Sequence, residues 1–486
     1  MMPSMRLMHT AVAALVLLAG GAGAHTNELP ELGDASSAIV SPEAERALGQ
    51  QALRQIRAQV PTSDDPLLKY FTQVNIRGLA QYADLNETVL YPVLVDSPEI
   101  NAFAVPGGII GINLGLYLYA EDVHEYSSVV AHELAHLSQR HFARQVEKMQ
   151  GMSLSVLAGV LASVAIIAAG GDADAAMATM QGSQALAQDS MLRYSRTREQ
   201  EADRIGLNIL VEAGYDPRGV SRMFERMQRA FRHTMSQRPP EFLLTHPLTE
   251  SRISDARDQA SRMSKGEYEP SADYQFMRAR VRVHYADTPK QAVVAARARA
   301  KEGEPGSVRR LAGIYELAVA LAGDGEYDEA ADTMQVLRGQ RPDSILTTAS
   351  LAEVLIEGGR PQEALDVLDS QLYLNPDNDP LTMLHARALS AKGDHDEASR
   401  VLWRHAQKRP QDSDIWYLLA ETEVLAGSTV GIYRARAEFF ALHGDYNGAV
   451  RHLEYASRLV GDDDRLRARL AQRILDLRTE REAAGG

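Results

Sequence analysis

A period of 34 residues in the second half of the chain restricts the fold more than any other feature of the sequence. The hexapeptides GEYDEA, GRPQEA and GDHDEA begin at Gly325, Gly359 and Gly393, each 34 residues after the one before. A related hexapeptide, GDYNGA, begins at Gly444 after a jump of 51 residues, or one and a half periods. A glycine turn, an alanine five residues later and a proline that ends the second helix are typical of tetratricopeptide repeats. We therefore predict an α-solenoid over residues 266–486 rather than an unrelated helical array. The prolines with the same period are Pro342, Pro376 and Pro410.

The concave face of such a solenoid would bind peptides or partner segments. Trp403, Trp416 and Tyr417 are candidate binding anchors, although aromatic residues at helical spacing more often belong to the core of a repeat. This half of the chain carries no recognisable chemistry. Five histidines lack paired spacing and are predicted to lie at the surface: His385, His395, His405, His443 and His452.

The amino terminus has the pattern of a secretory signal peptide over residues 1–24. Arg6 precedes an apolar run, residues 11–18, and Ala22 to Ala24 offer a cleavage site for small residues. The run is short for a membrane anchor, so a cleaved signal is favoured and the mature chain would begin near His25. The chain contains no cysteine, which excludes disulfides and a lipid-modified amino-terminal cysteine. A bacterial periplasm fits these observations.

A net charge of −14 argues against a nucleic-acid partner. Affinity for phosphate backbones depends on clustered Lys and Arg side chains, and this acidic chain has a deficit of them. We therefore expect no nucleic acid among its partners.

The segment AHELAHLSQRH, residues 131–141, has the spacing of a metal site on a helix. Residues 121–149 are predicted to form one long helix, because apolar residues recur at helical spacing and neither Pro nor Gly interrupts them. Residues four apart lie on one face, so His132 and His136 can share an ion, and Glu133 can take a proton from its water. His141 is predicted to turn away from that face, solvated or packed. It also does not fit the metzincin pattern, which places a third histidine six residues after the second.

A second predicted helix, residues 194–217, offers carboxylates for the same ion. Glu199 and Asp203 lie four residues apart on one face. A carboxylate from one position would complete a His2Glu zinc site, and the other could orient a ligand imidazole. The alternative is a solvated acidic face. Glu201, two residues after Glu199, is expected to point elsewhere.

The HExxH segment followed by ExxxD resembles peptidase family M48. The resemblance covers roughly residues 40–260 and implies a zincin-like core, helical with a small β-sheet, over residues 25–265. It implies one zinc ion per subunit, with His132 and His136 as ligands and Glu133 as the general base. It also implies that Glu199 is the third ligand and that Asp203 supports a ligand histidine. The whole chain would then be mainly α, with the peptidase core preceding the solenoid.

Two further stretches resemble the same family. NAFAVPGG, residues 101–108, alternates apolar and polar positions before a turn, which predicts a strand that ends in a hairpin. At an edge beside the cleft it could hold a peptide in extended form, and an internal core strand is the alternative. THPLTESRI, residues 245–253, resembles a loop in which His246 would occupy the fourth metal position and block water. Arg252 in the same loop could stabilise an oxyanion or form a surface ion pair.

Residues 152–169 are uncharged throughout and long enough to suggest a membrane span. A span would leave His136 and Glu199 on opposite sides of a bilayer, where they could not share an ion. We therefore predict a helical flap over the cleft, with peripheral membrane contact, or alternatively a buried core helix.

The resemblance and the domain order together imply a periplasmic zinc endopeptidase. Its expected substrates are unfolded, stalled or misassembled outer-membrane proteins, and a chaperone-like contribution to their assembly is implied as well. The repeats would contact the barrel-assembly machinery. The alternatives are a non-proteolytic tetratricopeptide chaperone or adaptor and a metal-free binding module.

Overall fold

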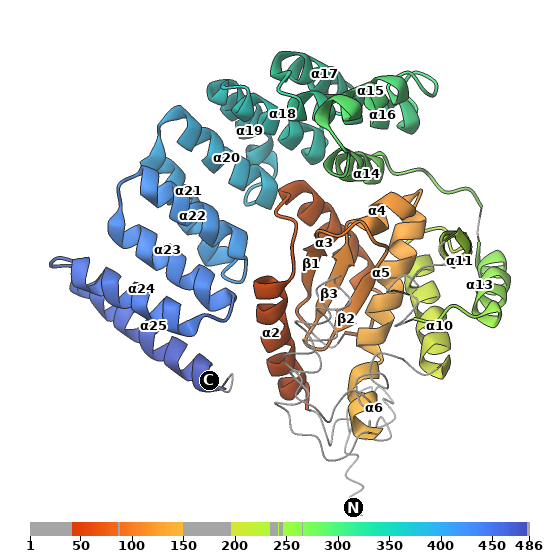
Figure 1. Ribbon diagram of the computed structural model, residues 1–486, viewed down its shortest axis with the longest axis horizontal. Coiled ribbons are helices and arrows are strands. Elements are labelled where there is room, and N and C mark those ends of the chain that lie inside the picture. Colours follow the sequence, from red (N-terminus) through yellow and green to blue (C-terminus); the bar gives the residue numbers. More distant parts are fainter. Residues whose placement is uncertain are drawn as a thin grey trace, which may run out of the picture.

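The computed structural model describes residues 41–85, 88–148, 196–233, 242, 246–264 and 266–483. They form the predicted mainly α fold, with a small sheet in the first half and an arc of helices in the second (Figure 1). The expected signal peptide and the segment 152–169 lie outside the described residues. Within the described ranges, no helix combines the length and the apolar character that a membrane crossing requires.

The sheet has three strands, β1 (Tyr91–Val95), β2 (Ala102–Val105) and β3 (Ile109–Asn113), in the order β1-β3-β2. β2 and β3 are antiparallel, so the predicted hairpin is confirmed, and β1 pairs with β3 in parallel. Gly107 and Gly108 in the hairpin turn have φ angles of 79° and 87°, which glycine adopts at least cost. In the strand order β1-β3-β2, β2 lies at an edge of the described sheet and not in its interior.

Helices cover both faces of the sheet (Figure 1). The main core cluster fills the space between the sheet, α3 (Pro66–Ala80) and α5 (Val123–Ser138), and it continues into the helices of the second half as far as Ala398. A smaller cluster lies under α2 (Pro42–Gln59) on the opposite face. Successive strand residues point to opposite faces of the sheet. Alternate apolar side chains therefore pack against α5 on one face and against α2 on the other. The strand side chains that face α2 are Val93, Val95, Phe103, Val105 and Ile109.

Residues 121–149 do not form the single helix that was predicted. α5 ends at Ser138, and α6 (His141–Lys148) begins after a turn in which Arg140 has a φ of 47°. The Arg140 guanidinium donates to Glu45 of α2 at 3.1 Å. The prediction was wrong at residues 139–140, because local periodicity contains no information about this contact with a distant helix.

The remaining helices of the first half pack around α5. α4 (Gly115–Tyr119) follows β3, and α10 (Arg196–Glu212) lies directly against α5. Gly206 allows that approach, since a Cβ atom there would lie 3.1 Å from the carbonyl oxygen of Ala131. α11 (Arg218–His233) and α13 (Glu250–Met263) complete this group.

The second half is the predicted solenoid of helical pairs, drawn from green to blue in Figure 1. Its helices form an arc that curves around the core. They are α14 (Ala272–His284), α15 (Pro289–Arg299), α16 (Val308–Gly323), α17 (Tyr327–Gln340), α18 (Ile345–Glu357), α19 (Pro361–Leu374), α20 (Asp379–Lys392), α21 (His395–Lys408), α22 (Ser413–Leu425), α23 (Thr429–Leu442), α24 (Tyr446–Leu459) and α25 (Asp464–Ala483).

The helix turns explain the irregular last step of the repeat. Gly325, Gly359 and Gly393 all have positive φ angles between paired helices, as the pattern predicts. Gly427, 34 residues after Gly393, has a φ of 69° and lies in the next such turn, although its hexapeptide lacks the usual pattern. Gly444 occupies the following turn, between α23 and α24. The period therefore continues to Gly427, and Gly444 lies half a period later, in the turn one helix further on.

Aromatic and histidine side chains of the solenoid divide between core and surface. Trp416 is buried, and its Nε1 donates to the carbonyl oxygen of Pro410 at 2.9 Å, so it belongs to the repeat core. Tyr417 is 57% exposed. His405 was predicted to lie at the surface, but it is buried, and its Nε2 lies 2.7 Å from Asp379 Oδ1. The other four histidines predicted to be at the surface are half-buried.

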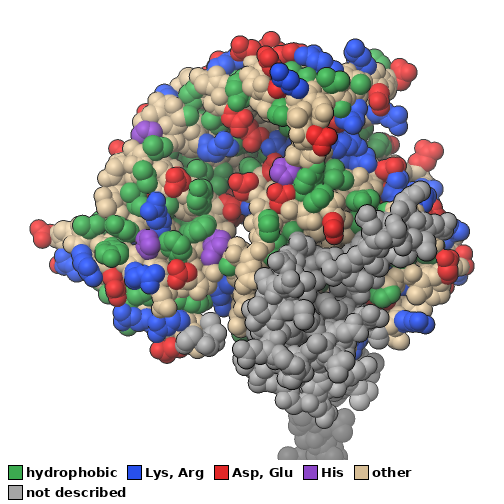
Figure 2. Space-filling model, in the orientation of Figure 1, with side chains coloured by type: hydrophobic (Ala, Val, Ile, Leu, Met, Phe, Trp, Pro, Cys, Tyr) green, Lys and Arg blue, Asp and Glu red, His purple; other side chains and the backbone are tan. Residues whose placement is uncertain are grey.

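Charged side chains join the arc to the core. Arg57 of α2 donates to the carbonyl oxygen of Gln411 at 2.8 Å, and Lys69 of α3 forms an ion pair with Asp414. Arg280 is buried and has two carboxylate partners, Asp65 and Glu353, at 2.8 and 2.9 Å. On the face shown in Figure 2, the surface is hollowed between the arc and the core.

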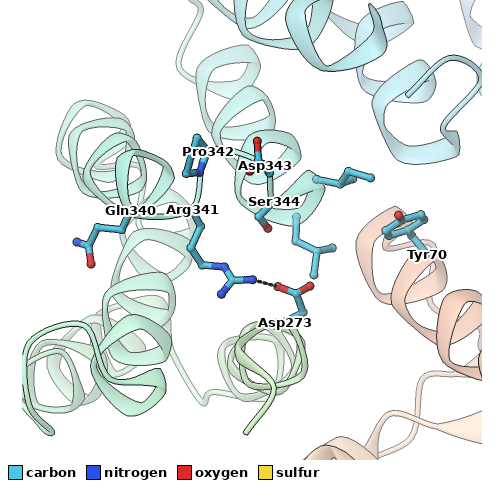
Figure 3. A pocket seen from close by; sticks show the side chains of 9 residues that line it. Tyr70, Asp273, Gln340, Arg341, Pro342, Asp343 and Ser344 are labelled. Atoms are coloured by element: carbon cyan, nitrogen blue, oxygen red, sulfur yellow. Dashed lines mark hydrogen bonds and ion pairs between the residues drawn. The ribbon is translucent and has the colours of Figure 1, made fainter. Parts of the chain in front are cut away.

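A cavity of about 430 Å³ lies where α3 meets the arc (Figure 3). Its walls include Tyr70, Asp273 and residues 340–346, and Arg341 lies 3.3 Å from Asp273. None of the predicted metal or catalytic residues lines it. The candidate chemistry is therefore elsewhere in the molecule.

Asp412 at the junction between arc and core makes stability depend on pH. Burial and the charges of Asp414 and Asp379 raise the pKa of Asp412 to about 6. The pKa is lower in the unfolded chain, so ionising Asp412 opposes folding as the pH rises through about 6. We expect Asp412→Asn, which keeps the oxygen that caps α22, to increase the free energy of unfolding at pH 7 by roughly 1–2 kcal/mol.

The advantage of Asp412→Asn should disappear below about pH 4, where the acid is protonated in both states. Denaturant unfolding of both proteins at the two pH values measures the effect. A variant that is less stable than the wild type at pH 7 would contradict this account.

Candidate metal centre

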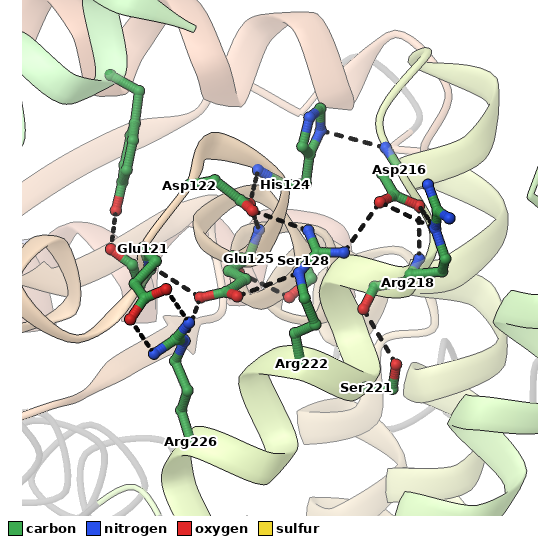
Figure 4. Close-up of polar contacts among 12 residues, drawn as sticks. Glu121, Asp122, His124, Glu125, Ser128, Asp216, Arg218, Ser221, Arg222 and Arg226 are labelled. Carbon is green, nitrogen blue, oxygen red and sulfur yellow. Dashed lines mark hydrogen bonds and ion pairs between the residues drawn. The ribbon is translucent and has the colours of Figure 1, made fainter. Parts of the chain in front are cut away.

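The amino-terminal turn of α5 is anchored by a partly buried network of charges (Figure 4). Asp122 caps the helix by accepting hydrogen bonds from the backbone N–H groups of His124 and Glu125. The fully buried Glu125 accepts hydrogen bonds from Arg222 at 3.2 Å and from Arg226 at 2.7 Å, both on α11. Sequence patterns do not reveal this network, because no local spacing links Glu125 to residues about a hundred positions later. This network holds the amino-terminal end of α5, the helix that carries the HExxH residues.

Two helices bring three of the predicted ligands together. His132 and His136 lie one turn apart on α5, and their Nε2 atoms are 3.0 Å from each other. α10 approaches with Glu199, whose carboxylate oxygens lie 3.5 Å from Nε2 of each histidine. All three side chains are buried. Glu199 is thus not part of a solvated acidic face.

His246 enters the same cluster from the chain after α11. Its Nδ1 lies 3.4 Å from His132 Nε2 and 3.1 Å from Glu199 Oε1. The candidate ligand atoms of His132, His136, Glu199 and His246 all lie within 4.8 Å of one another. The site thus offers four buried donor atoms that could hold one metal ion.

The spacing of these atoms fits zinc. Ligands at 2.0–2.1 Å from a tetrahedral ion lie about 3.3–3.4 Å from each other. Five of the six pairs among the four donor residues have separations of 3.0 to 3.5 Å, and all four donor atoms lie within 4.8 Å of one another. Imidazole nitrogens and a carboxylate oxygen are also the donors that zinc prefers when no cysteine is present.

Asp203 and Arg252 support this cluster. Asp203 Oδ1 lies 3.1 Å from Nδ1 of His132, the ring nitrogen that points away from the cluster. Arg252 is only 3% exposed and donates two hydrogen bonds to Asp203, at 2.7 and 2.8 Å. A third nitrogen lies 2.9 Å from Glu199 Oε2. Arg252 is therefore not in a surface ion pair; it neutralises buried carboxylates, and its oxyanion role stays a prediction.

His141 lies close to the cluster, contrary to the expectation that it turns away. It is fully buried, and its Nδ1 lies 2.8 Å from Nδ1 of His136. Glu201 points away from the ligand atoms, as expected, but its Oε2 lies 3.3 Å from Nε2 of His141. The physical reason is the turn at residues 139–140, which redirects the chain after α5.

Glu133 lies beside the ligand histidines and is 1% exposed. Among the described residues, its Oε1 accepts no hydrogen bond, and His246 Nε2 is 3.6 Å away. The backbone of Ala104 in β2 lies close enough to this carboxylate group to act to lower its pKa. The edge strand thus runs past the residue predicted to act as the base.

Burial and charge set different pKa values for the carboxylates of the site. Burial raises the pKa of Glu133 above its ordinary value, although His246 and His132 oppose this shift. Burial also acts to raise the pKa of Glu199, but His246 and His132 outweigh it and hold that pKa well below its usual range. Burial acts to lower the pKa of His132, but Asp203 and Glu199 raise it to about 10. The site therefore pairs a carboxylate that stays ionised with one that holds a proton more readily.

Comparisons with known proteins agree with this geometry. Residues 72–260 match the family described as Peptidase family M48, and residues 355–422 match a tetratricopeptide repeat family. A beta-barrel assembly-enhancing protease of Yersinia pestis is 32% identical over 451 residues, which cover 93% of this chain and 91% of that protein. The protein of the same name from Escherichia coli K12 is 32% identical over 480 residues, 98% of this chain and 97% of that protein. Bovine mitochondrial metalloendopeptidase OMA1 is 35% identical over 158 residues, 32% of this chain and 29% of that protein.

Proposed function

Since this chain belongs to peptidase family M48 and is a metalloendopeptidase, we propose that it is a zinc enzyme of the bacterial periplasm that cleaves outer-membrane proteins. Stalled or misassembled barrel proteins are the proposed substrates. The relatives that match nearly its whole length are named beta-barrel assembly-enhancing proteases, which supports a role in barrel assembly. The signal-like amino terminus supports export.

The observation that carries this proposal is the convergence of two distant helices on one point. His132 and His136 come from α5 and Glu199 from α10, and their donor atoms lie within 4.8 Å of one another, close enough to share a single ion. We assign these three as zinc ligands and Asp203 as the carboxylate that orients His132. The proposed domains are the peptidase core, residues 25–265, and the repeat domain, residues 266–486.

In the mechanism that we propose, Glu133 moves the protons of peptide hydrolysis. When bound, zinc polarises the peptide carbonyl and lowers the pKa of a water molecule. Glu133 takes a proton from the attacking water and later delivers it to the leaving amine. Its raised pKa suits both steps, because the ideal pKa of a general base lies near the working pH. The edge strand β2, next to Glu133, is suited to hold the substrate in extended form through main-chain bonds.

The repeats are proposed to contact the barrel-assembly machinery and to support a chaperone-like contribution. Exposed Tyr417 is a candidate anchor on this domain. Peripheral membrane contact through residues 152–169 is also proposed, and no nucleic-acid partner is expected for a chain with a net charge of −14.

Metal analysis together with a cleavage assay tests the proposed function. The purified protein should contain one zinc ion per chain and cleave casein. Removing the ion with a chelator should abolish cleavage, and adding zinc back should restore it. A protein that holds no zinc would refute the proposal and favour a metal-free binding module. Zinc without cleavage, combined with suppression of aggregation, would favour the chaperone or adaptor.

We further propose that His246 restrains the enzyme by filling the position where water must bind. Catalytic zinc sites have three protein ligands and one open position. Because His246 Nδ1 lies 3.1 Å from Glu199 and 3.4 Å from His132, it is placed to be a fourth ligand. We expect His246→Ala to retain zinc and to cleave casein several-fold faster than the wild type.

His246→Gln provides a comparison for this prediction, since glutamine keeps part of the bulk without an imidazole. The cleavage rate per zinc ion should rise in both variants, and more in His246→Ala. Unchanged or lower activity in His246→Ala at equal zinc content would contradict the restraint.

A further inference from the structure

The turn between α5 and α6 places a second histidine behind a metal ligand. In an uninterrupted helix, His141 would lie five residues after His136 and point about 140° away from it. Instead, α5 ends at Ser138 and Arg140 adopts a left-handed conformation that is unusual for a residue with a side chain. A contact between Arg140 and Glu45 holds this turn. The uncommon backbone conformation of Arg140 therefore lies directly before His141, in the turn that changes the direction of the chain.

A continuous chain of polar contacts runs from His136 to the surface of α6. His136 Nδ1 lies 2.8 Å from His141 Nδ1, and His141 Nε2 lies 3.3 Å from Glu201 Oε2. The same oxygen of Glu201 accepts a hydrogen bond from Arg144 at 3.1 Å. His141 is fully buried, so water does not replace these partners.

The positions of the protons follow from the role of His136. A histidine that gives Nε2 to a metal carries its proton on Nδ1, and that N–H needs an acceptor. The acceptor in this chain is Nδ1 of His141, whose own proton is then on Nε2. That N–H donates to the Glu201 carboxylate. One tautomer of each ring satisfies the whole chain of contacts.

From this geometry we propose that His141 and Glu201 are positioning residues, which hold the ring of His136 in the tautomer and orientation that bind the metal. The proposal rests on the metal site described above. Both ligand histidines would then be oriented by carboxylates of α10: His132 directly by Asp203 and His136 through His141 by Glu201. The sequence EQEAD thus supplies a ligand and both orienting carboxylates from positions 199, 201 and 203 of one helix.

The test is the zinc affinity of the full-length protein, measured by competition with a chelator. Orienting partners of ligand histidines typically contribute 10- to 100-fold to metal affinity. We expect His141→Leu to weaken zinc binding by about that factor. His141→Asn should restore much of the affinity, because its side-chain oxygen can accept the His136 Nδ1–H. Glu201→Leu should also weaken binding, whereas Glu201→Gln keeps an acceptor and should stay near the wild type.

His405→Leu is the matched control. His405 is buried and paired with Asp379 at 2.7 Å, so its loss removes a similar histidine–carboxylate contact far from the metal centre. It should lower the thermal stability of the metal-free protein and leave the zinc affinity unchanged.

The outcomes separate this proposal from the proposed function. A wild type that binds no zinc refutes the function itself. A wild type that binds zinc, with His141→Leu and Glu201→Leu binding within about twofold of it, refutes only the positioning role. Equal losses in His405→Leu would also refute it, since they would reflect general destabilisation. If His141→Leu fails to fold, the Glu201→Leu and Glu201→Gln pair still decides.

Discussion

Glu133→Gln is expected to lower the rate of casein cleavage by about 100- to 10,000-fold, the usual contribution of a general acid–base group. Glutamine has nearly the same shape as glutamate but cannot take a proton from water. Glu133 lies beside His132 without being one of the four candidate ligand residues, so the variant should keep its zinc. Zinc content and the cleavage rate are measured on the same preparation.

The control for Glu133→Gln is Glu212→Gln, which makes the same chemical change at the exposed carboxy-terminal end of α10. That variant should cleave casein at nearly the wild-type rate, since Glu212 is not part of the metal cluster. Wild-type cleavage by Glu133→Gln would exclude Glu133 as the base. Loss of zinc from Glu133→Gln would show that Glu133 also helps to bind the metal.

Arg252→Met is expected to destabilise the peptidase core by about 3–5 kcal/mol, the cost of removing one member of a buried ion pair. Arg252 is 3% exposed and contacts the carboxylates of Asp203 and Glu199. Methionine fills a similar volume but leaves these carboxylates without the cation. Denaturant unfolding of the metal-free protein measures the effect, because bound zinc would partly compensate the charge of Glu199.

Arg280→Met is the matched control for Arg252→Met. Arg280 is also buried between two carboxylates, Asp65 and Glu353, but it lies where the arc meets the core. It should lower the stability of the metal-free and the zinc-bound protein equally, whereas Arg252→Met should lower the stability of the metal-free protein more than that of the zinc-bound protein. A loss of less than about 1 kcal/mol in Arg252→Met would contradict the role of Arg252 as the neutralising cation.

The predictions from sequence succeeded where a short range of residues contains the whole signal. The hairpin at residues 101–113 and the mainly α solenoid followed from spacing alone, and the structure confirms both. Their patterns depend on backbone conformation and on which face of an element is apolar. Such properties are local, so neighbouring residues encode them.

The predictions failed where a distant contact changed the direction of the chain. The spacing after His136 indicated a continuing helix, yet Arg140 and Glu45, 95 residues apart, hold a turn that ends it. His141 therefore lies behind His136 instead of facing away. The burial of His405 against Asp379 was missed for the same reason, since a pattern of single residues does not show which helix packs beside it.

The HExxH helix and the acidic helix after it can be read along the chain, because each is a regularity within a few turns of backbone. The repeat can be read as well, because its pattern recurs every 34 residues. The meeting of Glu199 with the two histidines, the burial of Arg252 between two carboxylates and the placement of His141 and His246 cannot be read in that way. They depend on how closely α10 packs on α5 and on where a turn redirects the backbone. Such contacts join residues that are far apart in sequence, and they form when the core excludes water and closes around them.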